Sequence, residues 1–243
     1  MYYPSEDLHL NIARGLVKGT SFIHKFGAVP TMSTGTRGTV WDVNDTLYPW
    51  QTIDSGPTTV YVSGVGAGDA GKLLTIEGLD ENYELASEEI ALDEIATITT
   101  TTVFSRVYRA YITSGFTLVS TIVIQRTGDN TTIAAVLGGN SQTLMAVYTV
   151  PAGYKGYLTK GVTSCQANAD ATIDMFVRYG GTSAFRIGHT AEVAGVGGQY
   201  NYDFTVPLEL PALTDIDIQA DVRSNNARVT AAFDIILIKD NLG

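Results

Sequence analysis

A glycine-rich stretch at residues 66–72, GAGDAGK, has the spacing of two phosphate-binding motifs. It matches the dinucleotide pattern G-x-G-x-x-G and most of the phosphate-loop pattern, but Leu73 stands where a Ser or Thr would bind magnesium. Both motifs need a helix directly after the glycines, because the helix N-terminus faces the phosphates. Residues 73–78 are β-type instead. The sequence therefore predicts a glycine-rich hairpin loop that binds no nucleotide.

The acidic residues at 80–91, DENYELASEEIA, partly match a calcium-binding loop. Such a loop has glycine at its sixth position and glutamate at its twelfth, where this chain has Leu85 and Ala91. A β-turn explains the segment better. The histidines, at positions 9, 24 and 189, lack the spacing of metal ligands. We therefore expect no metal and no cofactor.

Nucleophilic chemistry has little support in the sequence. Cys165 is the only cysteine, which excludes an intrachain disulfide, and no motif surrounds it. A small buried hydrophobic side chain is the role it best fits. The pattern G-x-S-x-G of a nucleophile elbow does not occur. A catalytic triad is assembled in space and so stays open, but we predict that the protein is not an enzyme.

The charge balance limits the partners. The net charge is −10 with an isoelectric point near 4.6, which argues against binding to nucleic acid or to an anionic membrane surface. No apolar run reaches the roughly 18 residues that cross a bilayer, and the first residues lack the regions of a signal peptide. The sequence predicts a soluble protein made in a cytoplasm, with neither nucleic acid nor membrane as a partner.

Alternating apolar residues indicate strands. The clearest cases are 215–223 and 227–238, where every second residue is apolar, so each strand should have one buried and one exposed face. Asn225 and Asn226 lie between them and suit a tight hairpin turn. Further strand candidates, separated by turn residues, are 58–63, 72–78, 84–92, 97–112, 117–126, 143–150, 155–163, 171–179 and 200–206.

This spacing predicts an all-β fold with two β-sandwich or jelly-roll-like regions, at 57–127 and 128–243. Residues 1–56 lack a clean period and are predicted to be an extended N-terminal arm, with a short helix over 5–17 capped by Ser5. Large aromatic residues are spread along the arm. They fit two roles, packing on the chain's own domain or anchoring a partner in the arm's interface, and they are Phe22, Phe26, Trp41, Tyr48 and Trp50.

Three stretches resemble structural proteins of tailed bacteriophage virions. Residues 72–112 contain the form "ΦTΦxGLD" at 74–80, "SExΦxL" at 87–92 and "FxRΦxRAYΦ" at 104–112. Residues 15–50 resemble "GxxxxxxFΦHKFGxxP…TGTxxTΦWDxxxxYPW", and 144–159 read LMAVYTVPAGYKGYLT. These are patterns of strands and turns without a catalytic signature. The resemblance implies a virion part made in the host cytoplasm.

Within that group the resemblance favours a capsid decoration (cement) protein on the capsid surface. Its implied partners are the major capsid protein and copies of itself, most often as a trimer. The alternative is a tail, fibre or baseplate component that binds a receptor or glycan, with residues 167–170 or 195–200 as a recognition loop. A third reading is a carbohydrate-active or other enzyme on a sandwich fold, in which paired carboxylates could lie at the separation that a hydrolase needs. Copy number in the virion separates a cement protein from a tail part.

Overall fold

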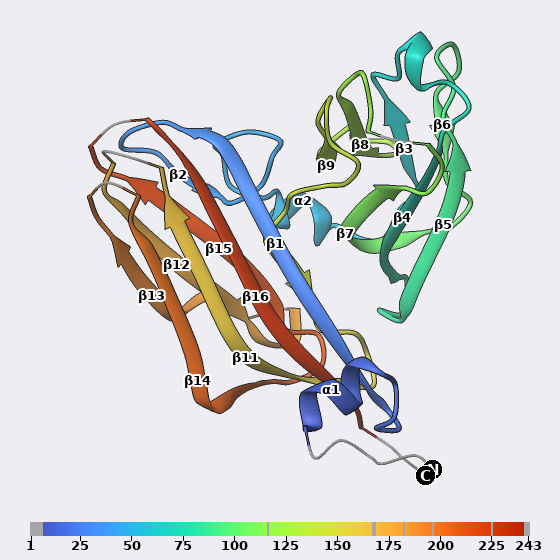
Figure 1. The fold of residues 1–243 in the computed structure, drawn as a ribbon. Coiled ribbons are helices and arrows are strands. Elements are labelled where there is room, and N and C mark those ends of the chain that lie inside the picture. The colour runs from blue at the N-terminus through green and yellow to red at the C-terminus, as the bar shows by residue number, and fades with distance from the viewer. Residues whose placement is uncertain are drawn as a thin grey trace.

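A computed structural model describes residues 7–115, 117–166, 169–181, 183–195, 197–224 and 226–240. The all-β prediction is confirmed, since strands make up most of the described chain. The helical elements are short: α1 (Leu8–Ala13), α2 (Trp50–Ile53), and the 3₁₀ turns η1 (Ala67–Asp69) and η2 (Tyr179–Gly181). The strands form a larger and a smaller body that lie side by side (Figure 1).

The larger body is a sandwich of two antiparallel sheets. Sheet A has the order β1 (Thr20–Met32), β16 (Ala227–Lys239), β11 (Tyr154–Cys165), β14 (Gln199–Leu210). Sheet B has the order β10 (Val147–Thr149), β15 (Asp215–Val222), β12 (Ala171–Arg178), β13 (Arg186–Val193), and β2 (Arg37–Thr39) also pairs with β15.

The apolar residues of β15 and β16 form the centre of the sandwich core, as their alternation predicts. The polar face of β15 differs from the prediction of an exposed face. Asp215 and Asp217 are fully buried, because Thr39 and Trp50 pack over this face and donate hydrogen bonds to Asp217. Asp217 is thus desolvated, and burial raises the pKa of its carboxyl group.

The smaller body has two antiparallel sheets of its own. Sheet C has the order β6 (Ile98–Thr99), β3 (Val60–Ser63), β8 (Ile122–Arg126), β9 (Thr132–Val136). Sheet D has the order β5 (Leu85–Ala91), β4 (Leu73–Asp80), β7 (Phe104–Ile112). A second core fills this body, with Leu74, Ile76, Ile122 and Ile124 inaccessible to solvent.

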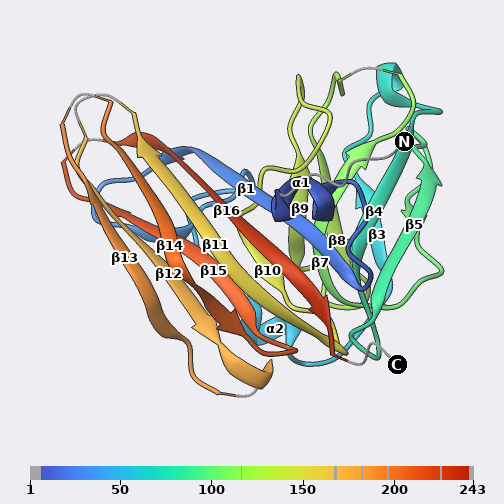
Figure 2. The ribbon, with the colours of Figure 1, turned by 60° about the horizontal axis from the view of Figure 1, so that its bottom comes forward.

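The order of the elements corrects the predicted division at residues 56 and 127. Residues 20–39 are not an arm, because β1 pairs with β16 along most of its length and β2 pairs with β15. Residues 132–136 belong to the smaller body, because β9 pairs with β8. The smaller body is therefore an insertion between β2 and β10 of the sandwich, and of its edge strands β7 lies toward β10 while β5 lies on the side away from the sandwich (Figure 2).

The short helix α1 lies at one end of sheet A (Figure 1). Its N-cap is Asp7, whose Oδ1 accepts hydrogen bonds from the backbone N–H groups of His9 and Leu10 at 2.9 and 3.2 Å. Ser5, the predicted cap, lies outside the described residues. Within the described ranges, no helix is long and apolar enough to cross a membrane.

Candidate partner-binding surface

Three of the five predicted interface residues are buried inside the chain. Trp41, Tyr48 and Trp50 are 2%, 3% and 8% exposed. Their rings form a continuous row, with centroids 5.2 Å apart for Trp41–Tyr48 and 4.8 Å apart for Tyr48–Trp50. The prediction that these three anchor a partner is wrong, because a side chain without accessible surface has nothing to offer a second protein.

The row of rings instead joins the two bodies. Trp50 donates its indole N–H to Asp217 of β15 at 3.0 Å, and Tyr48 donates its hydroxyl to the carbonyl oxygen of Val107 in β7 at 3.2 Å. Trp41 donates its indole N–H to the carbonyl oxygen of Thr46. The polar ends of all three side chains are thus satisfied inside the protein, as burial of an aromatic residue requires.

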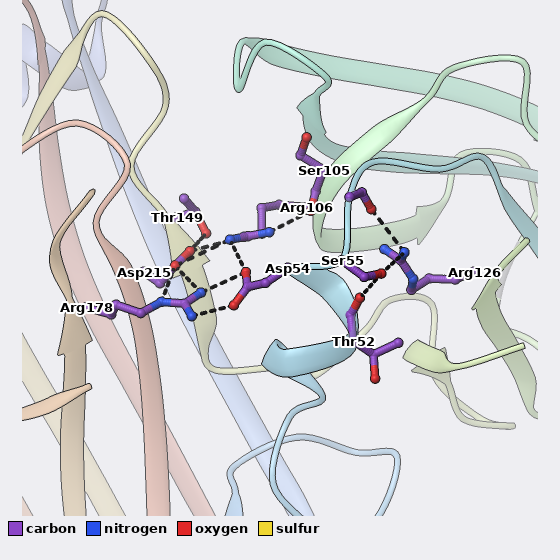
Figure 3. A network of polar contacts seen from close by, with 10 residues as sticks. Thr52, Asp54, Ser55, Ser105, Arg106, Arg126, Thr149, Arg178 and Asp215 are labelled. Carbon is purple, nitrogen blue, oxygen red and sulfur yellow. Dashed lines mark hydrogen bonds and ion pairs between the residues drawn. The ribbon is translucent and has the colours of Figure 1, made fainter. Parts of the chain in front are cut away.

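A network of two arginines and two aspartates, all buried except Asp54, lies at the same junction (Figure 3). Arg106 of β7 and Arg178 of β12 both contact Asp54, at 2.9 and 2.5 Å, and Asp215, at 3.1 and 2.6 Å. Thr149 adds a hydrogen bond to Asp215 of 2.6 Å. Five separate segments of the chain therefore meet at one charge cluster: the end of α2 and the strands β7, β10, β12 and β15.

The network has a structural rather than a chemical character. Both carboxylates accept hydrogen bonds from two guanidinium groups, so their oxygen atoms are already engaged within the chain. Burial works against the charge of Arg106, but Asp215 and Asp54 outweigh it and raise the pKa of Arg106 above its usual value. A cluster with every charge paired across two bodies holds them in one arrangement. Sequence analysis missed it, because its four charged members come from segments that lie far apart in the sequence.

A second polar contact crosses the junction. Lys25 of β1 is 6% exposed and donates to the carbonyl oxygen of Tyr108 in β7. Burial, and then the charge of Arg109, lower the pKa of Lys25 to about 7. Burial raises the pKa of the nearby Asp42 to about 7, although the backbone N–H of Leu144 donates to its carboxylate at 3.1 Å.

The glycine-rich loop joins β3 of sheet C to β4 of sheet D, so it is a connection between sheets and not the predicted hairpin. Asp69 holds it, accepting from the backbone N–H groups of Val119 and Ser120 at 2.8 and 2.7 Å and from Lys72 at 2.7 Å. Burial opposes ionisation of Asp69, but these hydrogen bonds lower its pKa to about 2. The lysine that a phosphate would need is engaged by this carboxylate.

The remaining two predicted interface residues lie on the outer face of sheet A. Phe22 is 47% exposed and Phe26 is half-buried. The register places Phe22 beside Ile236, and Phe26 beside Ala232, which in turn neighbours Val162. We define the outer face as these five residues of sheet A: Phe22, Phe26, Val162, Ala232 and Ile236. His24 and Asp234 lie between its two apolar rows and form an ion pair of 2.5 Å when the histidine is charged.

The outer face is hollowed at both rows. A groove of about 360 Å³ lies between α1 and the strands, lined by Leu10, Phe22 and Ile236. A second hollow of about 250 Å³ is lined by Phe26 and Val162. Leu10 is 45% exposed at the first groove. Apolar side chains that remain accessible around a groove are typical of a surface that another protein covers.

Other sequence candidates have plain structural roles. Cys165 is confirmed as a small buried residue of the sandwich core, and burial raises the pKa of its thiol. The predicted recognition loops, 167–170 and 195–200, lie partly outside the described residues, as does the Asn225 half of the predicted turn. In their described parts, Gly195 donates its backbone N–H to Asp170 at 3.2 Å. Among the described residues, no cluster of three His, Cys, Asp or Glu side chains could hold a metal ion.

Comparison with known proteins gives only distant similarities. No protein family and no curated protein matches the chain. Among solved structures it is similar to that of infectious bursal disease virus strain Gx, with a TM-score of 0.29 and 9% identity over 92% of this chain and 73% of that one. The VP2 subviral particle of the same virus is similar with a TM-score of 0.23 and 11% identity, over 92% of this chain and 73% of that one. The exported protein XepA of PBSX is similar with a TM-score of 0.21 and 8% identity, over 87% of this chain and 86% of that one. These similarities carry no functional argument.

Proposed function

We propose that this chain is a virion structural protein, and within tailed bacteriophages a capsid decoration (cement) protein that binds the major capsid protein lattice. The observation that carries the proposal is the apolar outer face with its groove under α1. The resemblance of residues 15–50, 72–112 and 144–159 to phage virion proteins supports the same role.

The construction of the chain suits a cement protein. The ion network and the buried aromatic row fix the inserted body on the sandwich, so that force on one body is transmitted to the other. The outer face lies on a four-stranded sheet, which presents its side chains in a fixed order. Rigid presentation lowers the entropy cost of binding a lattice.

The proposed assembly is a trimer of this chain on the capsid surface. Light scattering of the purified protein should then give three times the 26.0 kDa of one chain. A monomer at every concentration would leave the capsid lattice itself to impose the trimeric arrangement.

Copy number in purified virions tests the role. A cement protein is present in hundreds of copies, so its stained band should be comparable to that of the major capsid protein on a molar basis. A ratio that corresponds to only a few copies per particle would contradict the cement role and favour the tail or fibre alternative. Absence from purified particles would contradict a virion role altogether.

A further inference from the structure

A cavity of about 40 Å³ lies between sheets A and B, where their edge strands β14 and β13 come together. Its floor is formed by Gly161 and Thr163 of β11 and its far wall by Met175 of β12. His189 of β13 and Tyr202 of β14 close it toward solvent. None of these residues belongs to the outer face or to the junction between the two bodies.

Gly161 leaves the space open. It lies in the middle of β11, with Tyr202 and Phe233 as its register partners on the two sides. A Cβ atom at this position would have no other atom within 4 Å, so packing does not require a glycine here. Glycine weakens a strand, and in a strand interior it often marks a place where a ligand approaches the backbone.

Two polar atoms of residues that line the cavity have no hydrogen-bond partner. The Oγ1 atom of Thr163 and the Nε2 atom of His189 are both buried without a hydrogen-bond partner. An unpaired buried group of this kind destabilises the folded state, because it loses its hydrogen bonds to water without replacement. Both residues line the same cavity, whose other walls are largely apolar and aromatic. A hydroxyl group donates one hydrogen bond and accepts others, so it is the kind of group that these two atoms lack as a partner.

The mouth of the cavity is aromatic and is able to widen. The ring of His189 lies 4.6 Å from that of Tyr202 and 5.8 Å from those of Tyr200 and Phe204. Tyr202 is 38% exposed. β13 pairs with β12 and β14 with β11, so no backbone ladder joins the two edge strands. The ladder of β14 is also interrupted between residues 203 and 208.

We propose that this edge is a binding site for a phenolic group, a planar apolar ring that carries one hydroxyl. The hydroxyl would lie between Thr163 and His189. The ring would take the place of the Tyr202 side chain, which turns outward, because the present cavity is smaller than the roughly 150 Å³ that holds a benzene ring. The ring would then pack against His189 in a tilted arrangement, as the ring of Tyr202 does in this structure at an interplanar angle of 38°.

Calorimetric titration of the full chain with phenol tests the site, with benzene as the ligand that lacks the hydroxyl. We expect saturable binding of phenol and at least tenfold weaker binding of benzene. Gly161→Ala fills the floor and Thr163→Val removes one hydrogen-bonding atom at nearly constant shape, so each should weaken phenol binding at least tenfold. Thr205→Val, on the exposed part of β14, is the matched control and should bind as the wild type does.

The proposal is overturned if phenol shows no saturable binding up to its solubility limit, or if both cavity variants bind it with wild-type affinity. Thr163→Val decides alone if Gly161→Ala does not fold. N-acetyltyrosinamide separates the two sources of such a group. If it binds as well as phenol does, the natural ligand is a tyrosine of a partner protein, and if only phenol binds, it is a free small molecule.

Discussion

At the scale of single residues, the junction between the two bodies depends on Asp215. Its side chain is fully buried and contacts both Arg106 and Arg178. The desolvation of two guanidinium groups is tolerated only because Asp215 and Asp54 are both present. Removal of one of the two acids would therefore destabilise the protein strongly, because both arginines would stay buried with only one acidic partner.

Asp215→Ala should lower the free energy of unfolding by about 3–5 kcal/mol, because it leaves two buried arginines with a single acidic partner. Urea denaturation followed by circular dichroism measures the change. The control is Asp203→Ala, whose side chain is 78% exposed and pairs with Lys160 at 3.6 Å, and a surface pair of this kind contributes roughly 0–1 kcal/mol. If both substitutions lower the free energy of unfolding equally, the network does not stabilise the junction between the two bodies.

Asp42 gives a pH dependence with a definite sign. Burial raises its pKa from 3.8 to about 7, so between these values the folded chain holds a proton that the unfolded chain has released. Stability from this group therefore falls as the pH rises from about 4 to 7. The loss is at most roughly 4–5 kcal/mol, since the pKa rises by about three units and each unit corresponds to about 1.4 kcal/mol.

Asp42→Asn should remove this loss, because an amide does not titrate and its oxygen still accepts from Leu144. Urea midpoints of variant and wild type, measured from pH 4.5 to 7.5, should diverge in favour of the variant as the pH rises. Parallel curves would mean that Asp42 keeps an ordinary pKa in the folded protein. Lys25, whose lowered pKa acts from about 7 to 10.5, is not expected to contribute to the slope below pH 7.

At the scale of elements, sequence periodicity predicts which face of a strand is apolar and buried, but not whether other elements cover the second face. The apolar face of β16 is buried as its alternation indicates. The polar face of β15 shows the same alternation but is also buried, because residues from β2 and α2 cover it. No local pattern in 215–222 reveals this cover. The glycine-rich loop is a similar case: the strand that follows the glycines, β4, was predictable, but the assignment of β3 and β4 to different sheets was not.

Phe233→Ala tests the predicted register of the β16 core face. Phe233 is 2% exposed, so the substitution should lower the free energy of unfolding by about 3–5 kcal/mol. Phe22→Ala on the outer face of the same sheet is the matched control and should cost much less, since that ring is 47% exposed. A Phe233→Ala variant that melts within a degree or two of the wild type would refute the register.

At the scale of the whole molecule, the chain leaves the sandwich after β2 and returns to it at β10. The sequence did not reveal this insertion, because the pairing that defines it, β1 with β16, joins residues some 200 positions apart. For the same reason the aromatic residues of 1–56 were ambiguous. Isolated large rings among Gly, Thr and Pro are compatible with a core and with an interface, and the structure places Trp41 and Trp50 in the core and Phe22 on the surface.

The most direct test of the account is cosedimentation of the purified chain with phage particles that lack it. The wild type should bind to saturation. Leu10→Ser combined with Phe22→Ser, which makes the groove on the outer face polar, should lower the bound fraction at least tenfold while the fold remains intact by circular dichroism. Ile95→Ser, an exposed apolar position on the inserted body, should bind as the wild type does. Full binding by the double variant, or loss of binding by Ile95→Ser alone, would contradict the assignment of the outer face as the capsid-binding surface.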